Sequence, residues 1–326
     1  MIEILTTGLP NTVQDLGRPG YLALGISRGG AMDSQALAIA NLMLGNDPSA
    51  AGIEVALYPF RLKPHVDISV AITGADCPII VGGRRCPPWW ATAIRAGETL
   101  LLEAPRAGAR SCIAFAGGLD LPPVLGSRAT DVKGGFGGLA GRGLSRGDRL
   151  RLNVAECPLP PGGLGAALAE RQAAGNGVAS PIELRVLPAA EFDAFTPQAH
   201  AAFTGSEWSI TGDANRMGYR LSGETLSLVS PLELLSHGIV PGTVQVPPSG
   251  QPIIQLADAN TCGGYPKIAT VIEADLWRLA QAPVGARLRF VPVSIEAATE
   301  ALRMARQQLD AFVAARNMRA GRLRAG

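Results

Sequence analysis

The sequence predicts a mainly β protein in two strand-rich parts with a few helices, and three features support this prediction. Glycine and proline contribute 40 and 25 of the 326 residues, which indicates many tight turns between short strands. Short apolar or alternating runs recur along the chain, and each is bounded by turn-forming residues. Residues 157–181 are rich in glycine, proline and alanine and interrupt this rhythm, as a linker between domains does.

The first predicted domain comprises residues 1–156. Its first 30 residues alternate short apolar stretches with glycine and proline, a pattern of strands and turns. A buried helix is expected over residues 32–44, between a candidate N-cap at Asp33 or Ser34 and a stop at Gly45. Further strands of an antiparallel sheet or barrel are expected at residues 66–72, 77–81, 99–103 and 111–116.

The second predicted domain comprises residues 182–293 and is again mostly β. Its strands are expected at residues 182–187, 226–229, 243–246, 253–256 and 287–291. After this domain, apolar residues recur three or four positions apart from Ile295 to Phe312, with Ser294 placed as an N-cap. Residues 294–326 are therefore predicted to form an amphipathic C-terminal helix, which docks by one face, followed by a basic tail.

Charge and cysteine content exclude several classes of protein. The 29 basic and 27 acidic residues are spread along the chain and aromatic residues are few, so nucleic acid is not an expected partner. Five scattered cysteines without a C-x-x-C pair indicate reduced thiols and no structural zinc site. No leader-like segment and no apolar run of roughly 20 residues is present, so no membrane span is expected. The predicted location is the cytoplasm.

A glycine-rich run from Gly134 to Gly143 is the nearest match to a phosphate-binding loop. It contains a G-x-G-x-x-A pattern, but it lacks the preceding strand and following helix of a dinucleotide-binding motif, and no P-loop motif occurs. A loop that cradles an anion and a purely structural turn are equally compatible with this run.

Histidine and lysine placement argues against a metal site and against attached biotin. His65, His200 and His237 lie far apart without metal-ligand spacing, so no metal ligand is predicted and each is interpreted as structural or exposed. The three lysines are not in an A-M-K-M context, so this chain is not expected to carry covalently bound biotin. A serine nucleophile in a G-x-S-x-G elbow is also absent from the sequence.

Four polar, glycine-dense clusters are the strongest candidates for binding, because turns at the ends of strands usually carry binding groups. Arginine and lysine in such turns can hold a carboxylate or a phosphate. The alternative is that these side chains tie loops together by hydrogen bonds and ion pairs. The candidates are Gln14, Asp15, Arg18, Arg128, Arg216, Arg220, Asp258, Thr261, Tyr265 and Lys267.

The same clusters resemble one protein family. The motifs are TVQDLGRPGY at residues 12–21, GGLDLP at 117–122, LGSR at 125–128, RMGYRL at 216–221, GTVQVP at 242–247 and TCGGYPKIA at 261–269. They are similar to those of the KipA-type, or allophanate-hydrolase-subunit-2-like, family, also called biotin-dependent carboxyltransferase. The resemblance runs from about residue 2 to about residue 293 and implies two β-barrel-like domains, the second cyclophilin-like. Cys262 and Asn260 depart from the residues commoner in the family.

The resemblance also implies an activity and partners. Free-standing bacterial members serve as the C-type subunit of an ATP-dependent 5-oxoprolinase, a hetero-oligomer in which this chain is not active alone. The B-type partner, a KipI-like protein, is expected to join it in activating 5-oxoproline with ATP, accompanied by Mg²⁺. The A-type partner, a LamB/YcsF-like protein, is expected to complete hydrolysis to glutamate. The ten candidate residues match motif positions that line a cleft for substrate or ATP, without an individual catalytic role for any of them.

Two other functions stay open at this point. One is the carboxyltransferase component of a biotin-dependent urea carboxylase or urea amidolyase. The absence of a fused biotin carboxylase or biotinyl domain favours the 5-oxoprolinase function over it. The other is a non-enzymatic regulator that binds a kinase inhibitor.

Overall fold

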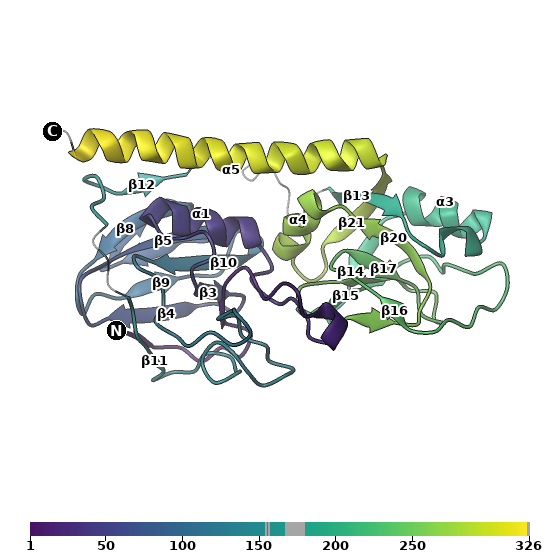
Figure 1. Ribbon diagram of the computed structural model, residues 1–326, viewed down its shortest axis with the longest axis horizontal. Helices are drawn as coiled ribbons and strands as arrows, with labels where there is room; N and C mark the ends of the chain where they lie inside the picture. The colour runs from purple at the N-terminus through teal and green to yellow at the C-terminus, as the bar shows by residue number, and fades with distance from the viewer. Residues whose placement is uncertain (154, 156, 167–179, 325–326) are drawn as a thin grey trace.

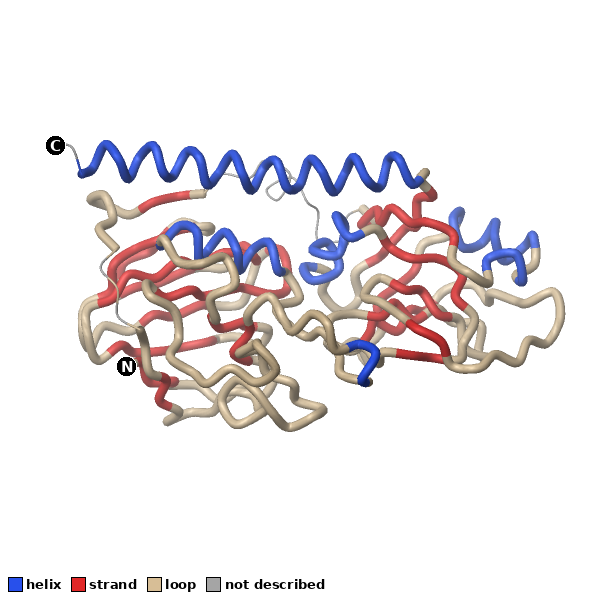
Figure 2. Tube along the Cα trace, in the orientation of Figure 1, coloured by secondary structure: helices blue, strands red, loops and turns tan. Residues whose placement is uncertain are grey.

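The structure, a computed structural model, describes residues 1–153, 155, 157–166 and 180–324. Two strand-rich bodies lie side by side, and one long helix runs along the same side of both (Figure 1). Strands, in red, and loops, in tan, make up most of both bodies (Figure 2). The prediction of a mainly β chain with a few helices is confirmed.

The first body is a sandwich of two six-stranded antiparallel sheets. One sheet has the order β11-β1-β4-β9-β6-β7, with β1 (Ile2–Ile4), β4 (Phe60–Pro64), β6 (Ile79–Val81), β7 (Arg84–Cys86), β9 (Leu100–Leu102) and β11 (Arg149–Leu150). The other has the order β12-β8-β5-β10-β3-β2, with β2 (Thr12–Gln14), β3 (Gly52–Val55), β5 (Ile68–Asp76), β8 (Trp90–Ile94), β10 (Ala107–Phe115) and β12 (Leu164–Gly165). Phe60 of one sheet and Phe115 of the other are fully buried in the shared core. Both sheets are open in the described residues, so this body is better described as a sandwich than as a barrel.

Helix α1 (Ser34–Leu44) covers the outer face of the second sheet. A carboxylate oxygen of Asp33 accepts a hydrogen bond from the backbone N of Ala36 at 3.0 Å, and Gly45 ends the helix in the left-handed region. Ala71 and Ala114 are buried beneath the helix, where their small side chains let it approach the sheet closely. The predicted buried helix, its cap and its stop are confirmed.

The second body is a closed seven-stranded barrel. Its order is β13-β20-β17-β18-β15-β14-β21, with β13 (Ile182–Pro188), β14 (Trp208–Ile210), β15 (Gly218–Ser222), β17 (Thr243–Gln245), β18 (Ile253–Gln255), β20 (Lys267–Val271) and β21 (Arg287–Pro292). The first and last strands pair in parallel, with Ile182 opposite Leu288, and so close the ring. Inside it, Phe203 stacks on Phe290 with ring centroids 4.3 Å apart.

Short elements complete the second body and the connection to it. They are α3 (Pro197–Gly205), α4 (Leu276–Gln281), the two-stranded sheet of β16 (His237–Gly238) and β19 (Cys262–Gly263), and the 3-10 turns η1 (Leu22–Leu24), η2 (Phe192–Ala194) and η3 (Glu273–Asp275). Helix α3 is not among the predicted elements. Its start had a readable signal, because Thr196 caps the backbone N of Ala199 at 3.1 Å and Pro197 occupies the first turn.

The strand predicted at residues 226–229 is wrong. Leu228 forms only an isolated bridge with Phe195 among the described residues, and Leu226 is buried against the barrel core without joining its ladder. The backbone N of Leu226 donates to Gly250 O at 3.0 Å, and that of Val229 donates to Ala194 O at 2.9 Å. Hydrogen bonding to neighbouring turns therefore replaces strand pairing here.

Helix α5 (Ile295–Arg324) is the long helix that spans both bodies in Figure 1. The Ser294 hydroxyl accepts a hydrogen bond from the backbone N of Ala297 at 3.2 Å, which confirms the predicted start. Leu309 and Phe312 pack against the α1 side of the sandwich, so the helix docks by one face. Its backbone stays helical through most of the predicted basic tail. No described helix has the length and apolarity needed to cross a membrane.

The predicted linker at residues 157–181 is described only in part. Strand β12 lies inside it and pairs with β8 of the sandwich, so the first residues of this stretch belong to the first body. Residues 167–179 lie outside the described residues. The domain boundary therefore stays a prediction.

Candidate functional site

The two bodies meet at a buried network of charged side chains centred on Arg216. This arginine, in the turn before β15, donates from Nε and Nη2 to the two carboxylate oxygens of Asp258 at 2.8 and 3.0 Å. Its Nη1 donates to Glu54 of β3 in the sandwich, and Nη2 also donates to Gly30 O at 2.6 Å. Burial alone lowers the pKa of Arg216, but the carboxylates of Glu54 and Asp258 raise it above its usual value. The guanidinium therefore stays charged and joins the bodies.

Arg110 adds a second connection beside Arg216. From β10 it donates through Nη1 to the Tyr219 hydroxyl and to Ala280 O, both at 2.7 Å. Gln281 donates to a carboxylate oxygen of Asp33 at 2.8 Å and accepts from the backbone N of Arg110 at 3.2 Å. Because these groups are hydrogen-bonded to both bodies, they stabilise the junction.

Arg18 lies fully buried under the glycine-rich run. Its Nη2 donates to Ala129 O at 2.5 Å and its guanidinium lies 4.8 Å from the Phe136 ring centroid. Its Nε and Nη1 have no hydrogen-bond partner among the described residues, although an Asp131 carboxylate oxygen lies 4.0 Å from Nη1. The glycine-rich run thus covers a cation that has two N–H-bearing nitrogens without a hydrogen-bond partner among the described residues.

Arg18 and Asp258 approach the same point from opposite bodies. A Cβ placed on Gly29 would lie 3.2 Å from Nη1 of Arg18 and 3.8 Å from a carboxylate oxygen of Asp258. Gly29 also has a φ of +62°. A larger residue would therefore fill the space between the two charged groups and strain the backbone.

Gln14 and Asp15 organise the turn beside Arg18. The Asp15 carboxylate accepts hydrogen bonds from the backbone N of Gly17 and the Ser127 hydroxyl, both at 2.7 Å, and from the backbone N of Arg128 at 2.5 Å. The Gln14 amide nitrogen donates to Thr12 Oγ1 at 2.9 Å, while its oxygen has no partner among the described residues. Asp15 therefore ties loops together, which is the structural alternative considered for the polar clusters.

A separate group of titratable side chains lies at one end of the barrel. Lys267 Nζ is 2.7 Å from Nε2 of His237, and the same nitrogen of His237 is 3.2 Å from a Glu191 carboxylate oxygen. Lys267 Nζ also donates to the carbonyl oxygens of Gly263 at 3.1 Å and Tyr265 at 3.3 Å. Burial lowers the pKa of Lys267, while Glu191 acts in the opposite direction. The lysine, the histidine and the carboxylate therefore form one contiguous polar cluster.

Sequence reasoning treated His237 as structural or exposed and did not identify Glu191. His237 is in strand β16, and its side chain is 41% exposed beside the buried amine of Lys267. Its position one residue before a glycine was the only signal in the sequence. Glu191, in the turn before η2, carried none.

The other candidates are not brought to the junction. Arg220 is exposed, since it lies in β15 between the buried Tyr219 and Leu221. Thr261 is half-buried and Tyr265 is 47% exposed near the barrel end. Arg128 points toward Leu121 on the sandwich. The ten predicted residues therefore divide among the junction, one end of the barrel, the exposed face of β15 and the sandwich surface instead of lining one cleft.

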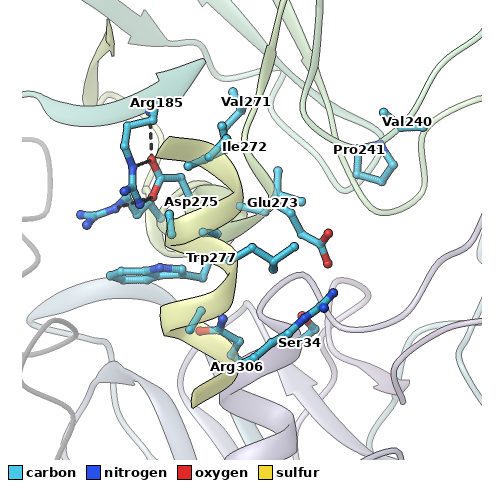
Figure 3. A pocket seen from close by; sticks show the side chains of 18 of the residues that line it. Ser34, Arg185, Val240, Pro241, Val271, Ile272, Glu273, Asp275, Trp277 and Arg306 are labelled. Atoms are coloured by element: carbon cyan, nitrogen blue, oxygen red, sulfur yellow. Dashed lines mark hydrogen bonds and ion pairs between the residues drawn. The ribbon is translucent and has the colours of Figure 1, made fainter. Parts of the chain in front are cut away.

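A groove of about 1100 Å³ lies between α5 and the two bodies, but none of the ten predicted residues lines it. Figure 3 shows Trp277 and the Arg185–Asp275 ion pair in its wall, together with Ser34 and Arg306. Nη2 of Arg185 lies 2.6 Å from a carboxylate oxygen of Asp275, so this pair fixes the wall. Among the described residues, no group of three histidine, cysteine or carboxylate side chains is arranged to hold a metal ion.

Comparison with known proteins identifies relatives over nearly the whole chain. Residues 24–292 match the family model described as carboxyltransferase domain, subdomain A and B. The chain is 42% identical to the C-type subunit of the 5-oxoprolinase of Escherichia coli (strain K12), over 92% of this chain and 94% of that protein. It is 30% identical to urea amidolyase of Saccharomyces cerevisiae over 90% of this chain, but it spans only 17% of that protein.

Solved structures are also similar over nearly the whole chain. The structure of Kluyveromyces lactis urea carboxylase aligns with a TM-score of 0.84 at 26% identity, over 95% of this chain and 29% of that one. The structure of TTHA0988 aligns with a TM-score of 0.77 at 32% identity, over 89% of this chain and 56% of that one. The chain therefore spans about half or less of these solved chains.

Proposed function

Because the chain belongs to the carboxyltransferase family of subdomains A and B, we propose that it serves as the C-type subunit of an ATP-dependent 5-oxoprolinase. The observation that carries this proposal is the similarity to the corresponding Escherichia coli protein, which extends over 94% of that protein as well as 92% of this chain. A KipI-like protein would be the B-type partner in the complex, and a LamB/YcsF-like protein would be the A-type partner.

The proposed reaction opens the five-membered lactam of 5-oxoproline to glutamate. ATP, carried with Mg²⁺, phosphorylates the lactam oxygen and releases ADP, and the lactam nitrogen loses its proton, which gives an activated imidate. Water then adds to the activated carbon, the ring C–N bond breaks, and a second water releases phosphate from the resulting acyl phosphate to leave glutamate. Cationic groups on the protein would neutralise the phosphates, and hydrogen-bond donors would hold the substrate carboxylate.

At the barrel end, His237 is the group that we assign to proton transfer. When the lactam oxygen is phosphorylated, the ring C–N bond becomes a C=N bond and the lactam nitrogen loses its proton. His237 is partly exposed and in contact with both Lys267 and Glu191, so it can accept that proton next to a carboxylate that stabilises the imidazolium. Lys267 keeps the imidazole oriented. The junction around Arg216 fixes the barrel relative to the sandwich.

We also propose the finer description of the fold and location. The closed barrel lies within residues 182–292, which supports a second domain of residues 182–293 with a cyclophilin-like barrel. The sandwich, with its strands between Ile2 and Gly165, supports a first domain near residues 1–156. The cytoplasm stays the proposed location.

The decisive experiment is 5-oxoproline-dependent glutamate formation by this chain mixed with its B-type and A-type partners and ATP, with each component omitted in turn. Activity should disappear when this chain is left out. His237→Gln should lower kcat roughly 100-fold or more, because general base catalysis contributes about that much. Lys63→Met, in β4 of the sandwich, should leave kcat unchanged. Full activity of His237→Gln would contradict the role proposed for this residue.

Carboxyl transfer from biotin is a second candidate, favoured by the TM-score of 0.84 with urea carboxylase. A complex that shows no glutamate formation but moves a carboxyl group from a biotinyl carrier protein to urea would establish it. In that case the 5-oxoprolinase proposal would be wrong.

A further inference from the structure

Three arginines line a second pocket on the sandwich, away from the barrel. The pocket has a volume of about 580 Å³. Its lining consists of Asp120, Leu121, Pro122, Pro123, Arg128, Arg149 and Arg151, which together we call the arginine pocket. No carboxylate of the described residues lies within ion-pair distance of any of these three guanidinium groups. The lining thus carries three arginines and one carboxylate, Asp120, and is net positive.

Arg128 is held rigidly in this pocket. Its backbone N donates to the buried Asp15 carboxylate at 2.5 Å, and its Nε donates to Leu121 O at 2.7 Å. The two Nη nitrogens make no hydrogen bond to the described residues. Because the rest of the side chain is fixed, these donors are oriented before any ligand arrives, which lowers the entropic cost of binding.

Arg149 and Arg151 form the other wall. Arg149 is in the edge strand β11, which pairs with β1, and Arg151 follows that strand by one residue. Residues two apart in an extended strand lie on the same face, so both side chains, which are exposed, project the same way. The backbone N of Asp120 donates to Arg151 O at 3.0 Å and ties this wall to the proline segment.

We propose that the arginine pocket binds the phosphates of a nucleoside triphosphate. One guanidinium group can bind two oxygens of a phosphate at the same time. Three guanidinium groups offset most of the negative charge of a polyphosphate chain. Pro122 and Pro123 add an apolar surface suited to a sugar or base, and the volume lies within the range of ligand pockets. The identity of the nucleotide as ATP rests on the proposed function, whereas the polyphosphate class rests on the pocket alone.

An acidic protein surface is the competing ligand for such a cluster. A concave site with one rigid arginine favours a small anion that enters it over a flat protein face. A protein contact through these arginines is therefore an outcome that the experiment must distinguish.

The test is titration of the full-length chain with ATP, tripolyphosphate, inorganic phosphate and adenosine by isothermal calorimetry. ATP and tripolyphosphate should bind saturably, more weakly as salt rises, and inorganic phosphate should bind less tightly. The variant R149A/R151A should weaken ATP binding by roughly 10-fold or more, since two charge-assisted hydrogen bonds are lost. The matched variant R85A/R95A removes two exposed arginines elsewhere on the sandwich and should bind ATP like the wild type.

Three results would overturn the proposal. They are no saturable binding of ATP or tripolyphosphate at millimolar concentration, equal affinity in R149A/R151A and wild type, and loss of binding to the B-type partner in R149A/R151A with nucleotide binding intact. Glutamate formation by the wild-type complex is measured in parallel. Glutamate formation without ATP binding in the arginine pocket would reject the pocket but keep the proposed function. ATP binding in the pocket without glutamate formation would keep the pocket but reject the proposed function.

Discussion

Arg18, which is buried, and Arg216, whose side chain is 13% exposed, flank the same short segment, Gly29 and Gly30, yet their guanidinium groups are satisfied differently. All three nitrogens of Arg216 donate to carboxylates or a carbonyl. In Arg18 only Nη2 has a partner among the described residues, while Nε and Nη1 have none. A saturated buried cation joins the two bodies, whereas an unsaturated one retains donors that a ligand can use.

Among substitutions that test this comparison, Arg216→Met is expected to lower the free energy of unfolding the most. This change leaves Glu54 and Asp258 buried without their main cation, so the free energy of unfolding should fall by about 3 kcal/mol or more. Urea denaturation measures it. Arg220→Met, on the exposed face of the neighbouring strand, is the matched control and should change stability by less than about 0.5 kcal/mol. Equal stability of the two variants would show that the junction contributes little.

A smaller loss in the free energy of unfolding is expected from Arg18→Met. The variant loses one hydrogen bond to Ala129 and the contact with the Phe136 ring, but it also removes two donors without partners, so about 1–2 kcal/mol is expected. The same denaturation experiment applies. A loss as large as that of Arg216→Met would mean that the Arg18 nitrogens are satisfied in solution, and the contrast between the two arginines would then disappear.

Lys267 offers a test through pH. Its pKa in the folded protein lies below the ordinary 10.5 because of burial, so in the window just below 10.5 the unfolded chain binds more protons than the folded one. The stability that Lys267 contributes should therefore rise with pH through this window. Unfolding free energies of wild type and Lys267→Met, measured from about pH 8 to pH 10, should diverge in favour of the wild type. A constant difference would contradict the depressed pKa.

The smallest effect is expected at an exposed ion pair. Arg142 donates to both carboxylate oxygens of Asp148 at 2.7 and 2.8 Å and, as the main cause, lowers the pKa of that carboxyl. Because Arg142 is exposed, Arg142→Ala should cost less than about 1 kcal/mol at neutral pH. This contribution should vanish as the pH falls below 3.8 and through the folded pKa of Asp148. A cost comparable to that of Arg216→Met would show that burial does not govern the strength of these pairs.

Local patterns in the sequence predicted the elements whose causes are local. Helix α1 follows from its apolar composition, the cap at Asp33 and the stop at Gly45, and the start of α5 follows from Ser294. The error at residues 226–229 arose because burial of Leu226 resembles that of a strand residue, while its backbone bonds to a turn. The apolar content of a segment indicates that it is buried, but it does not show whether the backbone pairs with a neighbouring strand.

Long-range pairing could not be predicted from these patterns. Glu54 and Arg216 are separated by 162 positions, and no periodicity or spacing relates them. The resemblance to a family directed attention to Arg216, Asp258 and Lys267, but not to Glu54, Glu191 or His237, which complete their contacts. The three arginines of the arginine pocket come from the loop at Arg128 and from the strand ending near Arg151, which meet only in the folded sandwich.

The parallel pairing of β13 with β21 sends the chain into the barrel at one rim and out at the other. The 30 residues of α5 then extend about 45 Å back over the sandwich, fastened to the barrel at one end. Such a helix is a lever: turning the barrel by roughly 10° would swing its far end by about 8 Å if the helix moved as a rod. Leu309 and Phe312, which pack beside α1, oppose this swing. A fluorophore at that end of the helix would therefore report small rotations between the two bodies.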